Sequence, residues 1–358
     1  MPVVLHRDPG SFQAERCVMA DKPVISIITP TYNRGASLER AIASVVAQSL
    51  ADFELIIVDD ASTDGSADVV RRCQDPRVRL HRFAARQGAN AARNHGIGMS
   101  RAEVVTFLDS DDEFLPHRLA RTVQVMGEDR STDVLLSSFH TCKRGSSVPS
   151  INPDARLGAD ELEHALMAHA VVIAGSAITV RRDVLARCGG FAPQLGRMQD
   201  RELLLNIARC QAAAGRDGAR LLAAPDWVKH QSADSISAPA YGFVEALGGL
   251  IECHPHLIAR YGSLVRYHVA RAVIAQLVRG RLKAAGRIYG ENLRVPAFRF
   301  TPAELMLAYV RGRRDRAGVT GAVRTSARRS PETHSVSMER VATIQLPARI
   351  PPATRKAA

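Results

Sequence analysis

Apolar and polar positions along the first part of the chain alternate in a way that predicts strands and helices in turn. Short apolar runs, of the length typical of buried strands, span residues 24–28, 53–58, 78–83, 104–108 and 133–138. Between them, apolar side chains recur at helical spacing, as in the segment that begins at Leu38. Because strands that alternate with helices form a parallel sheet covered on both faces, the pattern predicts an α/β fold.

Beyond residue 140 the pattern is less regular. The segment 145–153 is rich in Ser and Pro, which predicts a loop, and the apolar run 171–180 predicts a strand or another buried segment. Helical spacing returns in four segments, which span 160–169, 201–210, much of 243–290, and 302–310. After residue 317 the chain is rich in Arg, Ser, Thr and Pro and has few large apolar residues, a composition typical of disorder.

Polar residues follow three of the predicted strands at the point where each strand ends. The run 104–108 ends in three aspartates within 109–112, the run 53–58 ends in Asp-Asp at 59–60, and the first strand ends in Thr-Pro-Thr-Tyr-Asn-Arg. In an open parallel sheet, ligands bind outside the carboxyl ends of the strands, so we expect one shared pocket there. Clustered carboxylates repel one another, and a hard divalent cation would offset that repulsion; a solvated acidic loop is the alternative.

Four segments at these strand ends resemble the family 2 glycosyltransferases, which have the GT-A fold. In chain order they are Ile27-Ile-Thr-Pro-Thr-Tyr-Asn-Arg34, Val58-Asp-Asp-Ala-Ser-Thr-Asp-Gly-Ser66, Ala92-Arg-Asn94 and Leu108-Asp-Ser-Asp-Asp112. A fifth similar segment spans 181–191 and is followed by Asp200. The order and spacing of the segments match the family, and the resemblance covers residues 22–235.

The resemblance implies both a fold and an activity. The fold would be a mainly parallel central sheet flanked by helices, with a C-terminal helical extension. The activity would be metal-assisted, non-processive transfer of a sugar from a nucleotide-diphosphate sugar, a UDP-sugar in the first instance, to an acceptor hydroxyl with inversion. A glycan or lipid-linked acceptor in cell-surface polysaccharide or glycolipid synthesis is the implied setting.

The resemblance also implies roles for particular residues. Those implied in nucleotide-sugar binding are Thr29, Pro30, Tyr32, Asp60, Arg86, Arg93 and Asp109. Asp111 is the expected direct ligand of Mn²⁺ or Mg²⁺, with Asp109 and His230 as further metal ligands. Asp200 is the expected general base, although Gln199 stands where similar enzymes carry the first acid of a pair.

Four of these residues also have an alternative role that is structural. Asp60 suits a turn, Arg93 a surface ion pair and His230 a structural or solvated position. Asp200 precedes a predicted amphipathic helix, where an aspartate is a good N-cap. The sequence leaves these alternatives open.

Charge and composition divide the chain unevenly. Residues 238–358 hold 20 Lys and Arg against 7 Asp and Glu, whereas the first 237 residues hold 28 against 29. A basic region of this kind can attract anionic lipid or nucleic acid, or it can be an Arg-rich helical surface with no such partner. Peripheral contact with the inner membrane through this region is therefore one of two hypotheses, and we expect no nucleic-acid partner.

We expect four parts along the chain. They are a poorly ordered extension over 1–21, a GT-A domain over 22–237, a basic helical extension over 238–316 and a disordered tail over 317–358. No apolar run approaches the ~18–20 residues that a membrane span needs, and no secretory signal is apparent. The 6 cysteines lack metal or redox spacing, which indicates reduced thiols and a cytoplasmic protein.

Two rival functions come from other classes. A nucleotidyltransferase has a similar sheet but needs a Gly-rich phosphate loop after the first strand, and Thr-Pro-Thr-Tyr-Asn is not one. A basic membrane-binding or nucleic-acid-binding protein with a non-catalytic GT-A domain is the other rival. The chain has no Gly-x-Gly-x-x-Gly after a strand, which argues against a dinucleotide oxidoreductase, and it has no P-loop.

Overall fold

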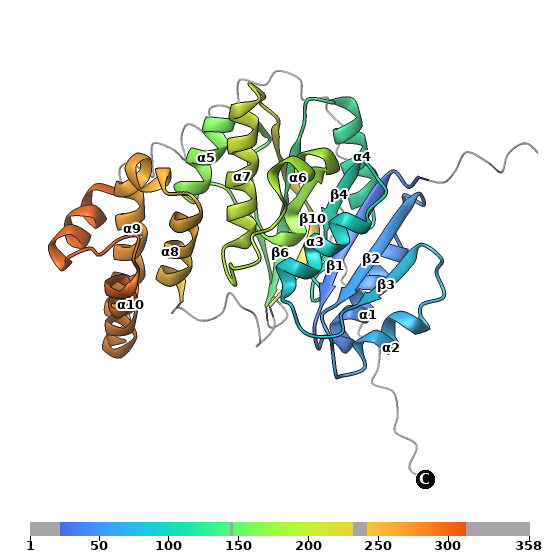
Figure 1. Ribbon diagram of the computed structural model, residues 1–358, viewed down its shortest axis with the longest axis horizontal. Helices are drawn as coiled ribbons and strands as arrows, with labels where there is room; N and C mark the ends of the chain where they lie inside the picture. The colour runs from blue at the N-terminus through green and yellow to red at the C-terminus, as the bar shows by residue number, and fades with distance from the viewer. Residues whose placement is uncertain (1–21, 144–145, 232–241, 313–358) are drawn as a thin grey trace, which may run out of the picture.

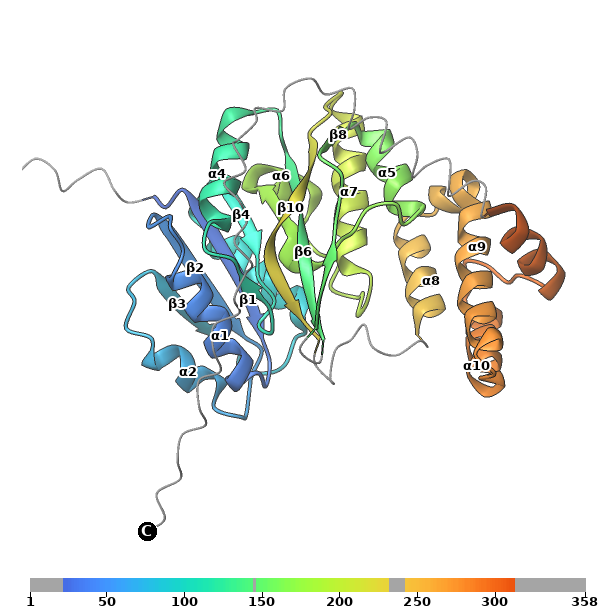
Figure 2. The ribbon, with the colours of Figure 1, turned by 180° about the vertical axis from the view of Figure 1, so that it is seen from behind.

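The computed structural model describes residues 22–143, 146–231 and 242–312, and their strands form one ten-stranded sheet (Figures 1 and 2). Along its main path the strand order is β3-β2-β1-β4-β9-β6-β10-β5, with β7 beside β6 and β8 beside β10. The strand bounds are β1 Ile25–Thr31, β2 Phe53–Asp59, β3 Val78–Arg82, β4 Val104–Phe107, β5 Glu113–Phe114, β6 Val134–Lys143, β7 Ser146–Ser150, β8 Ala155–Leu157, β9 Ile178–Arg181 and β10 Ala219–His230.

Two parallel blocks make up the sheet. Strands β3, β2, β1 and β4 are parallel, and β6 is parallel to β10, whereas β9 runs antiparallel to both of its neighbours, β4 and β6. The carboxyl ends of β1, β2, β4, β6 and β10 therefore share one edge of the sheet. Figures 1 and 2 show this edge at the lower side of the molecule.

Helices cover both faces of the sheet, as the alternating pattern predicts. The helix bounds are α1 Gly35–Val46, α2 Ser66–Arg72, α3 Ala89–Met99, α4 Arg118–Glu128, α5 Ala159–Met167, α6 Arg182–Cys188, α7 Gln199–Ala213, α8 Phe243–Cys253, α9 His256–Val278 and α10 Leu282–Arg294, with a final helix over 302–312. In β1, Ile25 and Ile27 pack with α1 in one apolar cluster, whereas Ile28 belongs to the cluster on the other face. A Cβ at Gly96 of α3 would lie 2.5 Å from Ile28, so the glycine lets α3 approach β1 closely.

The C-terminal helices continue the core of the sheet domain. Leu257 and Val265 of α9 belong to the same buried apolar cluster as α5 and α7. The His268 ring nitrogen lies 2.8 Å from the Met167 carbonyl oxygen, which links α9 to α5. No helix in the described ranges is both long and apolar enough to cross a membrane.

Several expectations need correction against this fold. The first strand extends to Thr31, three residues past its predicted end. The predicted loop at 145–153 is wrong in part, because Ser146–Ser150 forms β7 against β6. The apolar pattern also missed β10. The extension over 1–21 and the tail over 317–358 lie outside the described residues.

Candidate active site

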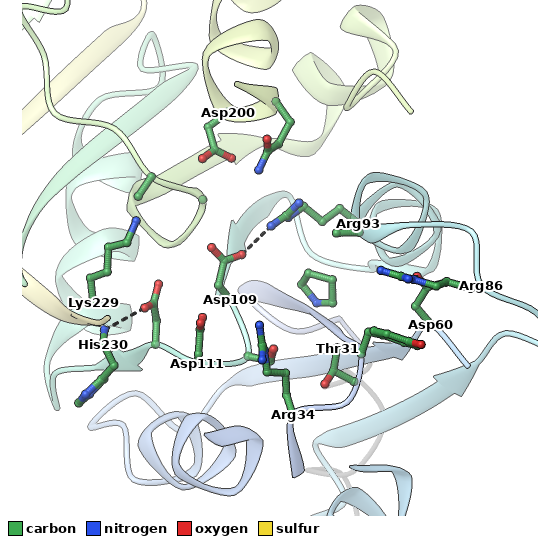
Figure 3. Close-up of a pocket in the computed structure, with 18 residues that line it drawn as sticks. Thr31, Arg34, Asp60, Arg86, Arg93, Asp109, Asp111, Asp200, Lys229 and His230 are labelled. Atoms are coloured by element: carbon green, nitrogen blue, oxygen red, sulfur yellow. Dashed lines mark hydrogen bonds and ion pairs between the residues drawn. The ribbon is translucent and has the colours of Figure 1, made fainter. Parts of the chain in front are cut away.

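A cavity of about 350 Å³ opens at the carboxyl ends of the strands (Figure 3). Its floor is formed by the residues that follow β1, β2 and β4, and its far wall by the start of α7 and the end of β10. The cavity is lined by Pro30, Thr31, Tyr32, Arg34, Asp60, Arg86, Ala89, Arg93, Asp109, Ser110, Asp111, Asp112, Ala174, Gly175, Gln199, Asp200, Lys229 and His230. The shared pocket expected at the strand ends is therefore present.

One end of the cavity is shaped by Asp60, Arg86 and Tyr32. Asp60 is buried, and its two carboxylate oxygens accept hydrogen bonds from the backbone N–H groups of Gln87 and Gly88 at 2.6 and 2.8 Å. The Arg86 guanidinium lies 4.1 Å from the centre of the Tyr32 ring and 3.9 Å from Asp60. A flat aromatic and guanidinium surface beside a fixed carboxylate suits a nucleoside, because a base can stack and a hydroxyl can donate to the carboxylate.

Arg93 is a buried cation at the floor of the cavity. It lies on α3 and donates to the Asp109 carboxylate at 2.6 Å. Nearby on α3, the Asn94 side chain bonds both the N–H and the carbonyl of Phe191 at 2.8 Å. A Cβ at Gly190, which has a φ of 71°, would lie 2.5 Å from the Asn94 amide oxygen, so this contact needs a glycine. The Gly-Gly-Phe segment is thereby held against α3.

Three carboxylates lie close together after β4. Burial, and then the Asp109 carboxylate, raises the pKa of Asp111 above its ordinary value. The same causes raise the pKa of Asp112 still further, although Ser176 donates a hydrogen bond to Asp112 at 2.6 Å. Arg40 donates to the Asp111 carbonyl oxygen at 2.6 Å and so fixes the backbone of this loop. The cluster therefore carries an electrostatic cost that a bound cation would relieve.

Asp200 enters the cavity from the opposite wall (Figure 3). It is the second residue of α7, whose N-cap is Met198, so Asp200 is not the helix cap. One carboxylate oxygen of Asp200 is buried and has no hydrogen-bond partner among the described residues. Burial raises the pKa of Asp200 to about 6, the Arg93 guanidinium opposes that rise and the Asp109 carboxylate adds to it.

Two cations face the carboxylates, Lys229 from one side of Asp111 and Arg34 from the other (Figure 3). Lys229 at the end of β10 and Arg34 after β1 both line the cavity, and both lower the pKa of Asp111 electrostatically. The neighbouring His230 donates its backbone N–H to Asp112 at 3.3 Å. Its ring lies 3.0 Å from Glu113 and points away from the cavity (Figure 3). A metal role for this ring would require it to turn about its side-chain bonds.

The donor set suits a hard divalent cation. Asp109 and Asp111 offer carboxylate oxygens, the ligands that Mg²⁺ and Mn²⁺ prefer. No group of three or more His, Cys, Asp or Glu side chains is arranged to hold a metal within the described ranges. The arrangement fits a cation held by one or two carboxylates and completed by substrate phosphates and water, which is the usual way that proteins bind Mg²⁺.

All of the residues expected from the sequence line the cavity except Thr29. Thr29 lies inside β1 and is 1% exposed, and Thr31, two residues further on, lines the cavity instead. The sequence interpretation assigned no role to Arg34 or Lys229. Arg34 stands within the first motif, but no pattern in the sequence indicates that Lys229 lies near the end of a strand.

Comparisons with known proteins show what the chain is similar to. Residues 26–189 match the family model for glycosyl transferase family 2. An uncharacterized glycosyltransferase of Nostoc sp. is 47% identical over 118 residues, which make up 32% of this chain and 36% of the relative. The putative teichuronic acid biosynthesis glycosyltransferase TuaG of Bacillus subtilis is 38% identical over 109 residues, 30% of this chain and 43% of the relative. The matched segments thus cover less than half the length of these relatives.

A solved structure resembles the chain over most of its length. Staphylococcus aureus TarS 1-349, in complex with UDP-GlcNAc, superimposes with a TM-score of 0.59 at 18% identity and covers 85% of this chain and 91% of that one. The fold is therefore the GT-A fold of glycosyltransferases. Residues 26–189 are thus similar to glycosyltransferase family 2, and the chain as a whole shares the fold of such an enzyme.

Proposed function

We propose that the chain transfers a sugar from a nucleotide-diphosphate sugar to an acceptor hydroxyl in a single, inverting displacement. The observation that carries this proposal is the position of Asp200. Its buried, unpaired carboxylate oxygen faces the carboxylates after β4 across a cavity that is large enough for a donor. A base on the wall opposite the nucleotide side is the arrangement that attack on the far face of an anomeric carbon requires.

In the proposed reaction, the acceptor oxygen forms a bond to the anomeric carbon as the bond from that carbon to the diphosphate oxygen breaks. Asp200 takes the proton of the acceptor hydroxyl. The electron pair of the broken bond leaves with the nucleoside diphosphate. Lys229 and Arg34 lie where they can compensate that negative charge. Asp60, Arg86 and Tyr32 hold the nucleoside.

Asp111 and Asp109 are the residues that would hold Mg²⁺ or Mn²⁺. Such a cation supplies positive charge beside the diphosphate. The Arg93 guanidinium holds the Asp109 carboxylate in place, so the pair orients one of the ligands. His230 stays a predicted ligand from the sequence alone.

The related proteins support a class of donor and a class of acceptor for this chain. TarS binds UDP-GlcNAc, and another relative is the poly(ribitol-phosphate) beta-N-acetylglucosaminyltransferase TarP of S. aureus, which is 37% identical over 130 residues, 35% of this chain and 39% of that protein. These relatives support a UDP-sugar as donor. The names of TarP and TuaG also support a glycan acceptor in bacterial cell-surface polysaccharide synthesis. A lipid-linked acceptor and a position at the cytoplasmic side of the membrane stay predictions from the sequence.

A panel of nucleotide sugars tests the donor proposal. With Mg²⁺ or Mn²⁺ present, we expect one UDP-sugar to raise the melting temperature, because a ligand at 100 times its dissociation constant stabilises by about 2.7 kcal/mol. Nucleoside triphosphates, which carry no sugar on the phosphate chain, are the substrates of a nucleotidyltransferase and serve as the comparison. Stabilisation by triphosphates alone, with no response to any sugar nucleotide, would contradict the proposal.

The pH dependence of transfer follows from the raised pKa of Asp200. The base works only when ionised, so kcat/KM should fall by about tenfold per pH unit below the Asp200 pKa of about 6 and level off above it. We would measure kcat/KM across this range for the wild type and for Glu202→Gln, a buried acid of the same helix outside the cavity. Both should share the acidic limb. A flat profile down to the ordinary pKa of a carboxyl group would exclude Asp200 as the base.

A further inference from the structure

The turn between α9 and α10 exposes apolar and basic side chains in one short run. Residues 277–283 have the sequence Leu-Val-Arg-Gly-Arg-Leu-Lys, and all seven are exposed. Its apolar side chains are highly exposed to solvent: Val278 is 82% exposed, Leu282 70% and Leu277 46%. We call this run the hairpin tip. A single exposed apolar residue is ordinary, but three within six positions at the end of a protruding hairpin indicate a contact surface.

The charge around the hairpin tip has one sign. Between Glu252 and Glu291 the sequence contains no acidic residue and 7 Lys or Arg, three of which, Arg279, Arg281 and Lys283, belong to the tip. None of these three forms an ion pair with another residue in the described ranges. The nearest acidic residue along α10, Glu291, is buried, where it accepts hydrogen bonds from the N–H groups at the start of α8. The tip therefore presents uncompensated positive charge to the solvent.

The hairpin tip projects on the same side of the molecule as the opening of the cavity. The start of α8 and the end of β10, which borders the cavity, both lie at the lower side of the molecule (Figures 1 and 2). Glu291 of α10 accepts hydrogen bonds from backbone N–H groups at the start of α8. Leu282 lies nine residues before Glu291 on α10, which is about 14 Å further along the helix at 1.5 Å per residue. The figures show the α9–α10 turn extending below the lower end of α8.

We propose that the hairpin tip docks on an anionic lipid surface. Apolar side chains interleaved with Lys and Arg are the composition that enters a membrane interface, where the chains reach the acyl boundary and the cations meet anionic headgroups. A nucleic acid would be a poorer partner, because the tip holds no aromatic side chain for stacking and its most exposed residues are aliphatic. Docking in this orientation turns the opening of the cavity towards the membrane.

The role of this docking in catalysis rests on the proposed function. If the acceptor is lipid-linked, a surface on the same side as the cavity would bring the acceptor hydroxyl to Asp200 without a membrane-spanning segment. Vesicle binding itself does not depend on transfer. A protein that binds vesicles but transfers no sugar would contradict only the proposed function. A protein that transfers sugar but binds no vesicles would contradict only the docking proposal.

Vesicle binding by three variants of the full chain tests the proposal. The charge variant is Arg279→Gln, Arg281→Gln and Lys283→Gln, and the apolar variant is Leu277→Asn, Val278→Asn and Leu282→Asn. The control carries the same number of apolar changes in the final helix, and these are Met306→Asn, Leu307→Asn and Val310→Asn, which are 60%, 51% and 63% exposed in the wild type. Vesicles of phosphatidylcholine with and without phosphatidylglycerol are the probes, at low and high salt.

The expected results differ between the variants. The wild type should prefer phosphatidylglycerol vesicles, and salt should weaken its binding. The charge variant should lose on the order of a hundredfold in affinity, because each cation near the surface contributes about fivefold. The apolar variant should lose at least about tenfold at any salt concentration. The control should bind as the wild type does, and melting temperatures should confirm that all of the variants fold.

Four outcomes would overturn the proposal. The first is no binding of the wild type to either vesicle, and the second is an equal loss of binding in the control. The third is binding to single-stranded RNA in preference to vesicles. The fourth is self-association of the wild type that the apolar variant abolishes, because a second copy of the chain would then cover the hairpin tip.

Discussion

The Asp200→Asn protein should transfer sugar about 10²–10⁴-fold more slowly than the wild type, the usual contribution of a general base. Asparagine keeps the shape of the side chain but cannot take the acceptor proton. UDP affinity should survive, because the nucleoside and the cation are expected on the other walls of the cavity, at Asp60 and Asp111. We would measure turnover and UDP affinity on one preparation.

Stability separates a catalytic role for Asp200 from a structural one. The folded-state pKa of about 6 exceeds the ordinary 3.8, so ionised Asp200 lowers stability above that range, and the penalty vanishes as the pH falls below 3.8. Asp200→Asn should therefore melt no lower than the wild type near about pH 8, with any gain shrinking as the solution is acidified. A variant that melts early and loses activity in proportion would show that Asp200 only supports the fold.

Glu202→Gln is the matched control for this substitution. Glu202 lies on the same helix, is buried, and lies 3.4 Å from His254 outside the cavity. Its substitution should leave kcat within about threefold of the wild type, as expected for a change away from the reacting atoms. If Asp200→Asn kept most of its turnover while Glu202→Gln lost it, the base would lie elsewhere.

The strand ends of the site could be predicted because their signal is local. Buried strands appear as apolar runs, and polar residues at their ends must converge in a parallel sheet. This reasoning predicts one pocket that Asp60, Asp109 and Asp111 share, and all three line the same cavity. The family resemblance places Thr29 in the site, next to a first strand that the pattern predicts to end at residue 28, whereas β1 continues through Pro30 to Thr31. The threonine that reaches the cavity is therefore two residues later.

The far wall could be predicted only in part. Strand β10 has register shifts on both sides of Pro225, which break the alternation by which a strand is recognised. The position of Lys229 at the cavity depends on that strand and on its parallel pairing with β6, a contact between distant segments. The N-cap role considered for Asp200 failed for a local reason, because α7 begins one residue before it. Sequence pattern does not fix a helix start to a single residue.

The Asp111→Asn protein should lose transfer by at least about a hundredfold, because a cation beside the diphosphate contributes several kcal/mol to the reaction. The substitution removes a charged oxygen ligand from a hard cation. It also removes one of the carboxylates whose repulsion raises the pKa of Asp112. Without a divalent cation, UDP should therefore bind the variant at least as tightly as it binds the wild type.

The response to the cation is the decisive measurement. Titration of UDP with and without Mg²⁺ or Mn²⁺ should show a large gain in affinity for the wild type and little or none for Asp111→Asn. Asp59→Asn is the control, because Asp59 is also a buried carboxylate at a strand end but is paired with Arg82 outside the cavity. It should keep the gain. If the wild type binds UDP equally well in EDTA, Asp111 holds no cation, and the positive charge beside the diphosphate must come from Lys229 and Arg34 alone.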